Sequence, residues 1–186
     1  MATVFDRLKD KAGDFRNRKS VDWYRAQINR LKIKTNASQL IRQGKTKGSP
    51  TEGNLNLFGY SPKYANTLKY YDVFPLVLPL RFVPGGFIGL NFHYLPPTLR
   101  FKLLDILQRY TNSPRFEANS RFVVYYDDLK NLNIIKPTLK RYLYAKATTP
   151  FLKINMDDAA IAAYLPVANF KKATERKVWA DSRRML

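Results

Sequence analysis

The chain has 186 residues, with 33 Lys or Arg against 14 Asp or Glu, so its formal net charge is +19 and its sequence pI is near 10.2. Hydrophobic residues make up 45% and aromatic residues 14%, which argues against global disorder. The absence of cysteine excludes disulfides and thiolate metal sites. So large a positive excess repels itself unless a polyanion or an acidic partner offsets it, and nucleic acid is the usual polyanion.

Other partners for the positive charge are an anionic membrane surface and an acidic protein. The sequence has no apolar run long enough to span a membrane and no apolar core of a signal peptide near its start. We therefore expect neither a transmembrane helix nor a secretory signal.

Basic residues are densest in residues 1–53, which hold 13 Lys or Arg and 5 Asp or Glu. From Val21, apolar residues recur at i, i+3, i+7 and i+10, which predicts an amphipathic helix whose basic side is either solvated or binds phosphate. We interpret residues 1–53 as a basic N-terminal helical arm with a linker, and residues 54–186 as a globular core with a basic C-terminal helix. The candidate nucleic-acid-binding residues are Arg16, Arg18, Lys19, Arg25, Arg30, Lys32, Lys34, Lys45, Lys47, Arg183 and Arg184.

A short helix is predicted at residues 36–43, followed by a loop at residues 44–56, which are rich in glycine and polar side chains. The loop contains Gly44-Lys45-Thr46, which looks like the end of a phosphate-binding loop. The glycine that such a loop needs five residues earlier is Gln39, and no strand precedes it. We therefore do not expect a nucleotide-binding loop.

Residues 56–71 mix aromatic residues with lysines. Such a mixture can stack bases while it holds phosphates. The competing interpretation is that these tyrosines belong to the core and its rim. We favour the second interpretation, because Tyr60-Ser61-Pro62-Lys63 predicts a turn, where such residues are common.

The centre of the predicted fold is a β-hairpin, with strands at residues 73–82 and 87–94 joined by a turn at Pro84-Gly85-Gly86. Both strands are apolar at nearly every position, so both faces are expected to be buried. Pro75 and Pro79 predict that the first strand lies at a sheet edge or contains a bulge, because proline cannot donate to the ladder.

The rest of the core is predicted to alternate between helices and short strands. A helix from Pro97 is expected to bury Leu99, Leu103, Ile106, Leu107 and Tyr110, with Arg100 off that face. The fold class is therefore α+β, a small β-structure seeded by the hairpin and surrounded by helices. The other predicted elements are strands at 121–126 and 151–155, a helical turn from Asp127, and helices at 137–147, 157–165 and 174–184.

The sequence offers little that could carry catalysis. The single histidine, His93, lies in the apolar hairpin, where a hydrogen-bonded core residue is expected. Asp127-Asp128 and Asp157-Asp158 are the only candidates for magnesium, but adjacent residues on a helix do not face one point, and both pairs suit helix N-termini. We expect no enzyme activity, metal, cofactor or small-molecule substrate.

Three segments give the chain a family resemblance: LFGYSPKYANTLKYYDVFPLVLPL, GGFIGLNFHYLPPTLRFKLLDIL and YLPVANFKKATERKVWADSRRML. They resemble small virion-associated proteins of T-even-like tailed bacteriophages and cyanophages, whose members are labelled DNA end protectors or structural proteins. The resemblance covers roughly residues 56–110 and 164–186. The basic segment before Asn54 is not part of it, so it implies no role for any residue there.

The resemblance implies a non-enzymatic virion component in the neck or tail, made in the host cytoplasm. We expect it to assemble with other virion proteins as a ring or multi-subunit complex and to contact packaged double-stranded DNA without sequence specificity. The alternative is a tail or baseplate assembly protein whose basic surface binds acidic virion proteins. A third hypothesis is a DNA- or RNA-binding regulator made early in infection.

Overall fold

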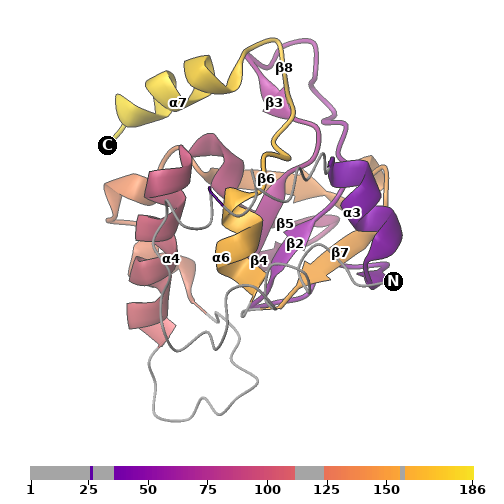
Figure 1. Cartoon of the computed structure of the whole chain (residues 1–186), viewed down its shortest axis with the longest axis horizontal. Coiled ribbons are helices and arrows are strands. Elements are labelled where there is room, and N and C mark those ends of the chain that lie inside the picture. The colour runs from indigo at the N-terminus through magenta and orange to yellow at the C-terminus, as the bar shows by residue number, and fades with distance from the viewer. Residues whose placement is uncertain (1–25, 27–35, 112–123, 156–157) are drawn as a thin grey trace.

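A computed structural model describes residues 26, 36–111, 124–155 and 158–186 (Figure 1). The predicted helix after Ser20 apart from Ala26, the first half of the predicted strand at 121–126 and the predicted cap at Asp157 lie outside these residues. The described residues include the whole of the predicted hairpin and the predicted helix from Pro97.

An antiparallel six-stranded sheet forms the framework, with strand order β1-β7-β2-β4-β5-β6. A second sheet pairs only β3 with β8. Helices and strands together confirm the α+β class. The large sheet comprises β1 (Thr46–Lys47), β2 (Leu55–Leu57), β4 (Leu76–Val83), β5 (Gly86–Asn91), β6 (Leu139–Leu143) and β7 (Phe151–Ile154), and the small sheet comprises β3 (Tyr71–Asp72) and β8 (Phe170–Lys171).

The predicted hairpin is present as β4 and β5. Gly85 takes a φ of +75° in the turn, a conformation open to glycine without steric cost. Gly86 lies so close to β6 that a Cβ there would collide with the backbone carbonyl of Tyr142. The returning strand ends at Asn91, earlier than expected, because the Asn91 side chain accepts a hydrogen bond from the His93 N–H and begins a 3-10 turn, η1 (Phe92–Tyr94).

β4 contains one of the two prolines, Pro79, and it lies at a bulge, which is one of the two predicted alternatives; β4 is not an edge strand. Its register against β5 shifts between Pro79 and Arg81, while β4 lies between β2 and β5 in the sheet. Leu76 and Val77 are the residues of β4 that pair with β2, so Pro79 lies beyond the end of β2 and pairs with β5 alone. The missing N–H of Pro79 therefore breaks no bond to β2.

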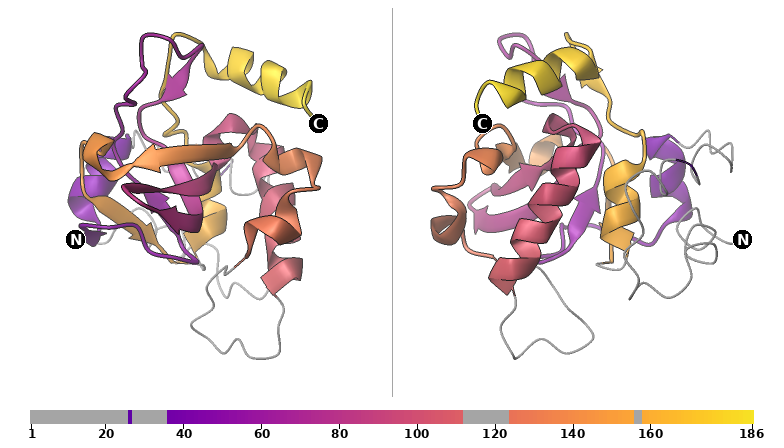
Figure 2. Two further views of the ribbon diagram at one scale, coloured as in Figure 1. Left: turned by 180° about the vertical axis from the view of Figure 1, so that it is seen from behind. Right: turned by 60° about the vertical axis from the view of Figure 1, so that its left-hand side comes forward.

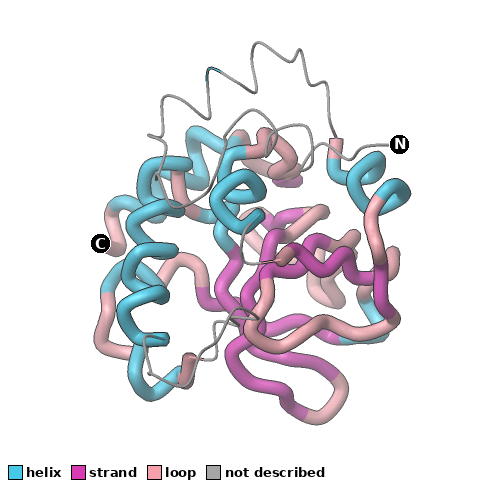
Figure 3. Tube along the Cα trace, turned by 60° about the horizontal axis from the view of Figure 1, so that its bottom comes forward, coloured by secondary structure: helices cyan, strands magenta, loops and turns pink. Residues whose placement is uncertain are grey.

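Five α-helices surround the sheet in the described part of the chain. Figure 1 shows α4 beside α6, and α3 and α7 at opposite ends of the molecule; Figure 2 gives the same arrangement from two other sides. Figure 3 shows the strands gathered beside the helices. The helices are α3 (Ala37–Gln43), α4 (Pro97–Thr111), α5 (Tyr126–Leu129), α6 (Ala159–Tyr164) and α7 (Glu175–Arg183), with 3-10 turns η2 (Asn133–Ile135) and η3 (Tyr144–Lys146) between them.

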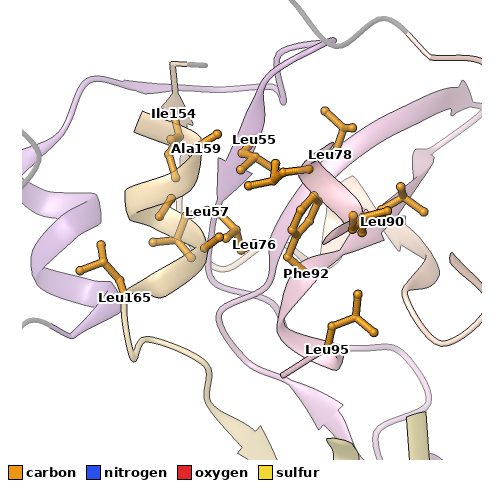
Figure 4. Packing of buried hydrophobic residues seen from close by; sticks show 14 of the residues in the cluster. Leu55, Leu57, Leu76, Leu78, Leu90, Phe92, Leu95, Ile154, Ala159 and Leu165 are labelled. Atoms are coloured by element: carbon orange, nitrogen blue, oxygen red, sulfur yellow. The ribbon is translucent and has the colours of Figure 1, made fainter. Parts of the chain in front are cut away.

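The sheet buries a different kind of core on each face. Leu76 and Leu78 of β4 and Leu90 of β5 point into an aliphatic core that α4 and α6 cover (Figure 4). Val77 and Phe87 point to the opposite face, because side chains alternate along a strand. There they join an aromatic cluster with Phe58, Tyr60, Tyr142 and Phe151. The prediction of two buried faces is confirmed except at the hairpin tip, where Phe82 is 43% exposed.

The structure overturns one predicted element and the described half of another. Residues 137–147 were expected to be helical, but Leu139–Leu143 form β6, because the open edge of β5 offers a full ladder of hydrogen bonds. Of the predicted strand at 121–126, Val124 and Tyr125 are not in a strand and Tyr126 begins α5. The helical turn expected at Asp127 is confirmed there.

Arg100 is also placed differently from the prediction. It is 2% exposed; its Nε donates to the Leu95 carbonyl at 2.7 Å and its Nη1 to the Ala163 carbonyl at 2.9 Å. Burial lowers the pKa of Arg100 to about 10. The side chain thus ties α4 to η1 and α6 from the inside.

Candidate nucleic-acid interface

A groove of about 730 Å³ runs between the segment of residues 60–72 and strand β6. The last residues of the chain, including Ser182 and Met185, border it as well. Residues far apart in the sequence therefore form this one surface. Six lining residues are tyrosines, namely Tyr60, Tyr64, Tyr70, Tyr71, Tyr94 and Tyr142, and four are basic, namely Lys63, Lys69, Lys140 and Arg141.

The tyrosines divide into a fixed base and a free edge. Tyr60, Tyr94 and Tyr142 are each at most 7% exposed, and the rings of Tyr60 and Tyr142 meet edge to face with their centroids 4.9 Å apart. Tyr64, by contrast, is 63% exposed. Tyr70 lies between these extremes, with its ring centroid 6.0 Å from that of Tyr94. Tyr64 thus offers an open ring in a groove whose buried tyrosines form a rigid base.

Each of the three lysines of the groove lies beside a tyrosine ring. The ammonium of Lys63 is 5.2 Å from the ring centroid of Tyr64, that of Lys69 is 5.5 Å from Tyr70, and that of Lys140 is 4.3 Å from Tyr94. Lys69 also pairs with Asp181 of α7, Nζ to Oδ2 at 2.7 Å, and this pairing with Lys69 and Lys177 lowers the pKa of Asp181 to about 2. The groove therefore combines aromatic faces with positive charge.

Lys140 is the most constrained of these cations. Its ammonium donates to the Pro137 carbonyl at 2.9 Å, and burial lowers its pKa from 10.5 to about 8. The folded protein thus holds fewer protons at Lys140 than the unfolded chain between about pH 8 and 10.5, so this residue makes the free energy of unfolding rise with pH across that window. Below pH 8 Lys140 is charged in the folded protein, and the desolvation of this charge lowers the free energy of unfolding.

Replacing this ammonium with an apolar group should therefore stabilise the fold. We expect Lys140→Met to raise the free energy of unfolding at pH 7 by about 1 kcal/mol, because a partly buried charge is removed while most of the packing is kept. The variant should also lack the rise between pH 8 and 10. Urea unfolding at both pH values measures this, and an equal loss of stability at both would contradict it.

A buried polar network supports the floor of the groove. The Asp72 carboxylate accepts hydrogen bonds from His93 Nδ1 at 2.8 Å and from Asn91 Nδ2 at 3.2 Å. Asn91 Nδ2 lies 3.1 Å from the hydroxyl of Tyr142, and burial raises the pKa of that hydroxyl well above its usual value. Burial also lowers the pKa of His93, so the imidazole stays neutral and donates through Nδ1. His93 is thus the hydrogen-bonded core residue that was expected.

The predicted binding residues do not form one site where the structure describes them. Lys45 and Lys47 lie beside and on β1, and Arg183 and Arg184 lie at the end of α7, at the opposite end of the molecule (Figure 1). All four side chains are exposed, and Arg184 lies 3.8 Å from Asp181. The other seven candidates, Arg16, Arg18, Lys19, Arg25, Arg30, Lys32 and Lys34, lie outside the described residues.

One side of the groove could be predicted from the sequence, and the other could not. The mixture of aromatic residues and lysines at 56–71 was recognised. The favoured interpretation, tyrosines of the core and its rim, is confirmed by the buried Phe58 and Tyr60 and the exposed Tyr64, whereas base stacking stays a prediction. Lys140 and Arg141 were missed because residues 137–147 were expected to be a helix. Residues 139–143 form a strand because they pair with β5, and this pairing leaves no mark in the local sequence.

Within the described ranges, no three His, Asp or Glu side chains are grouped so that they could hold a metal ion. Over the same ranges, no helix is both long and apolar enough to cross a bilayer. Asp127 and Asp128 lie in the first turn of α5, as expected of a helix N-terminus, and Asp127 pairs with Lys130 at 3.1 Å.

Fold and site together define a small, strongly basic α+β protein with a groove that places tyrosine rings beside cations, an arrangement typical of proteins that bind nucleic acids. The model of one protein family, described as Phage T4 terminal DNA protecting protein, matches residues 2–182. The chain belongs to this family, which confirms the resemblance and extends it into the basic N-terminal region. A search of curated proteins and a search of solved structures each found no match.

Proposed function

We propose that this chain is a non-enzymatic phage protein that binds the ends of double-stranded DNA and shields them. The observation that carries this proposal is the match of the DNA-protecting family to residues 2–182, nearly the whole chain. The net charge of +19 supports it, because phosphates are the charge complement of such a surface. Shielding an end requires only that the protein occupy it, so no catalytic constellation is needed.

In this proposal the phosphates are neutralised by residues 1–53, the basic arm, with Arg183 and Arg184 assisting. α3 and β1 attach the last part of this stretch to the core: Leu40 and Ile41 join the aliphatic core, and Thr46 and Lys47 pair with β7. Contacts with phosphates carry no sequence information. Binding is therefore expected to be independent of sequence and to fall steeply with salt.

The protein would act in the virion, in the neck or tail region, where it would meet the end of the packaged DNA and neighbouring virion proteins. The second candidate, a tail or baseplate assembly protein, rests on the same positive charge, which an acidic protein would also neutralise. The two differ in what binds to the basic surface.

An experiment with matched DNA molecules separates them. A blunt-ended linear duplex and a closed circle of the same sequence are titrated with the protein between about 50 and 300 mM salt, the range in which phosphate contacts are lost. We expect tighter binding to the linear form, a steep loss with salt and slower digestion of the linear form by an exonuclease. Equal binding to both forms without protection would leave only general DNA contact. No binding at the lowest salt would favour the assembly protein.

A further inference from the structure

We infer that the tyrosine-lined groove between residues 60–72 and β6 holds unpaired nucleotides at the end of a DNA molecule. This inference rests on the proposed function and assigns a different part of the end to each surface. The basic arm would hold the duplex, and the groove would take the single-stranded terminus.

The chemistry of the groove fits bases better than phosphates alone. Every base has a π-face, so an exposed aromatic ring beside a cation binds single strands of any sequence. Tyr64 supplies such a ring, and the ammonium of Lys63 lies 5.2 Å from its centroid. Arg141, exposed on the opposite wall, can hold a backbone phosphate or stack on a base. An acidic protein segment would use the cations and leave the rings without a partner.

The dimensions of the groove favour a single strand. Its volume of about 730 Å³ is of the order that encloses a small ligand, so it can hold a few nucleotides and cannot enclose a duplex. A duplex end would have to fray or carry an overhang before its last bases could enter. The groove thus discriminates between ends and continuous duplex, which the phosphate contacts of a basic arm cannot do.

One wall of the groove is fixed before any ligand binds. The ammonium of Lys172 donates to the carbonyls of Ala65, Asn66 and Leu68 at 2.6, 2.9 and 3.0 Å. The Ser61 N–H donates to the Lys146 carbonyl at 3.0 Å, and Lys69 is held by Asp181. A wall fixed in this way loses little conformational freedom on binding, which favours affinity.

The test uses the full chain, a fluorescent blunt duplex, the same duplex with an overhang of a few thymidines, and a short thymidine single strand. The groove variant is Tyr64→Ala with Arg141→Ala, two exposed residues whose loss should leave the fold intact. The matched control is Tyr125→Ala with Arg109→Ala, which removes the same residue types at exposed positions away from the groove; Tyr125 is 67% exposed and Tyr64 63%.

We expect the wild-type protein to bind the overhang duplex more tightly than the blunt one. The groove variant should lose about tenfold in affinity for the overhang duplex, or about 1.4 kcal/mol, as expected when a base loses its stacking partner. Its affinity for the blunt duplex should match that of the control. A thymidine strand carrying one photoreactive base should crosslink to residues 60–72 or 139–143.

Four results would overturn the inference. Equal binding of blunt and overhang duplexes by the wild type would remove the groove from recognition, while exonuclease protection would keep the proposed function. An unchanged preference for the overhang in the groove variant would place the single strand elsewhere. Displacement of the thymidine strand by polyglutamate as readily as by unlabelled strand would remove the groove assignment. Binding of no DNA at all would remove both the groove assignment and the end-binding function.

Discussion

A variant with four basic residues of the arm replaced by alanine is expected to bind duplex DNA about a thousandfold more weakly near 0.1 M salt. Each lost phosphate contact lowers the slope of log K against log salt by about 0.9, so the slope should flatten by about 3.6. The reason is that each contact releases a condensed counterion, and fewer releases mean less dependence on salt. The four residues are Arg16, Arg18, Arg30 and Lys32.

The control removes the same charge from the surface of the core. A variant in which Lys102, Arg109, Lys130 and Lys136, all exposed, are replaced by alanine should keep nearly the slope of the wild type. Fluorescence anisotropy with a blunt duplex at several salt concentrations measures both variants. If the two slopes flatten equally, binding follows the net charge of the protein and not the arm.

The Asp72→Ala substitution is expected to destabilise the fold by about 3–5 kcal/mol, because it leaves several hydrogen-bond donors around the removed carboxylate without an acceptor. Asp72 accepts four hydrogen bonds, from His93, Asn91, and the backbone N–H groups of Phe74 at 3.0 Å and Asn169 at 3.4 Å. The donors of His93 and Asn91 would stay buried without an acceptor, whereas those of Phe74 and Asn169 are only partly buried. For a chain of this length the melting temperature should fall by about 10 °C.

Two further substitutions make the result interpretable. Asp72→Asn keeps the oxygen that accepts from Phe74 and Asn169 but removes the charge, so it should cost less than Asp72→Ala. Asp128→Ala, at an exposed position on α5, should change the free energy of unfolding by less than about 0.5 kcal/mol. Urea unfolding of the three variants is the measurement. A loss below about 1 kcal/mol for Asp72→Ala would show that the network contributes little to the floor of the groove.

The Asp72 network and Lys140 have opposite effects on the stability of the fold, although both lie at the same groove. Asp72 stabilises the floor through the hydrogen bonds that it accepts, whereas Lys140 keeps a charge in a place where burial lowers its pKa to about 8. A cation kept against its desolvation cost, in a groove lined by tyrosines, is typical of a binding site. This contrast supports a binding role for the groove in addition to that proposed for the arm.

The hairpin and most helix boundaries could be read from the sequence because they depend on local chemistry. Gly85 permits the turn by its positive φ, Pro97 starts α4, and Thr174 caps α7 by accepting from the Lys177 N–H. Asn36 likewise closes a capping box with Gln39 at the start of α3. Each of these signals acts within a few residues, so no knowledge of distant segments was needed. The net charge and the family resemblance were also properties of the sequence alone.

Only the tertiary structure decided what residues 137–147 and Arg100 do. β6 forms because β5 presents an unpaired edge to it, a partner about fifty residues away that local propensity does not report. Arg100 is buried because the carbonyls of Leu95 and Ala163 meet at its side chain. The groove follows from the same long-range pairing, since it exists only where residues 60–72, β6 and the end of the chain come together. The sequence by itself determined a basic α+β protein; long-range strand pairing decided which tyrosines and cations share a surface.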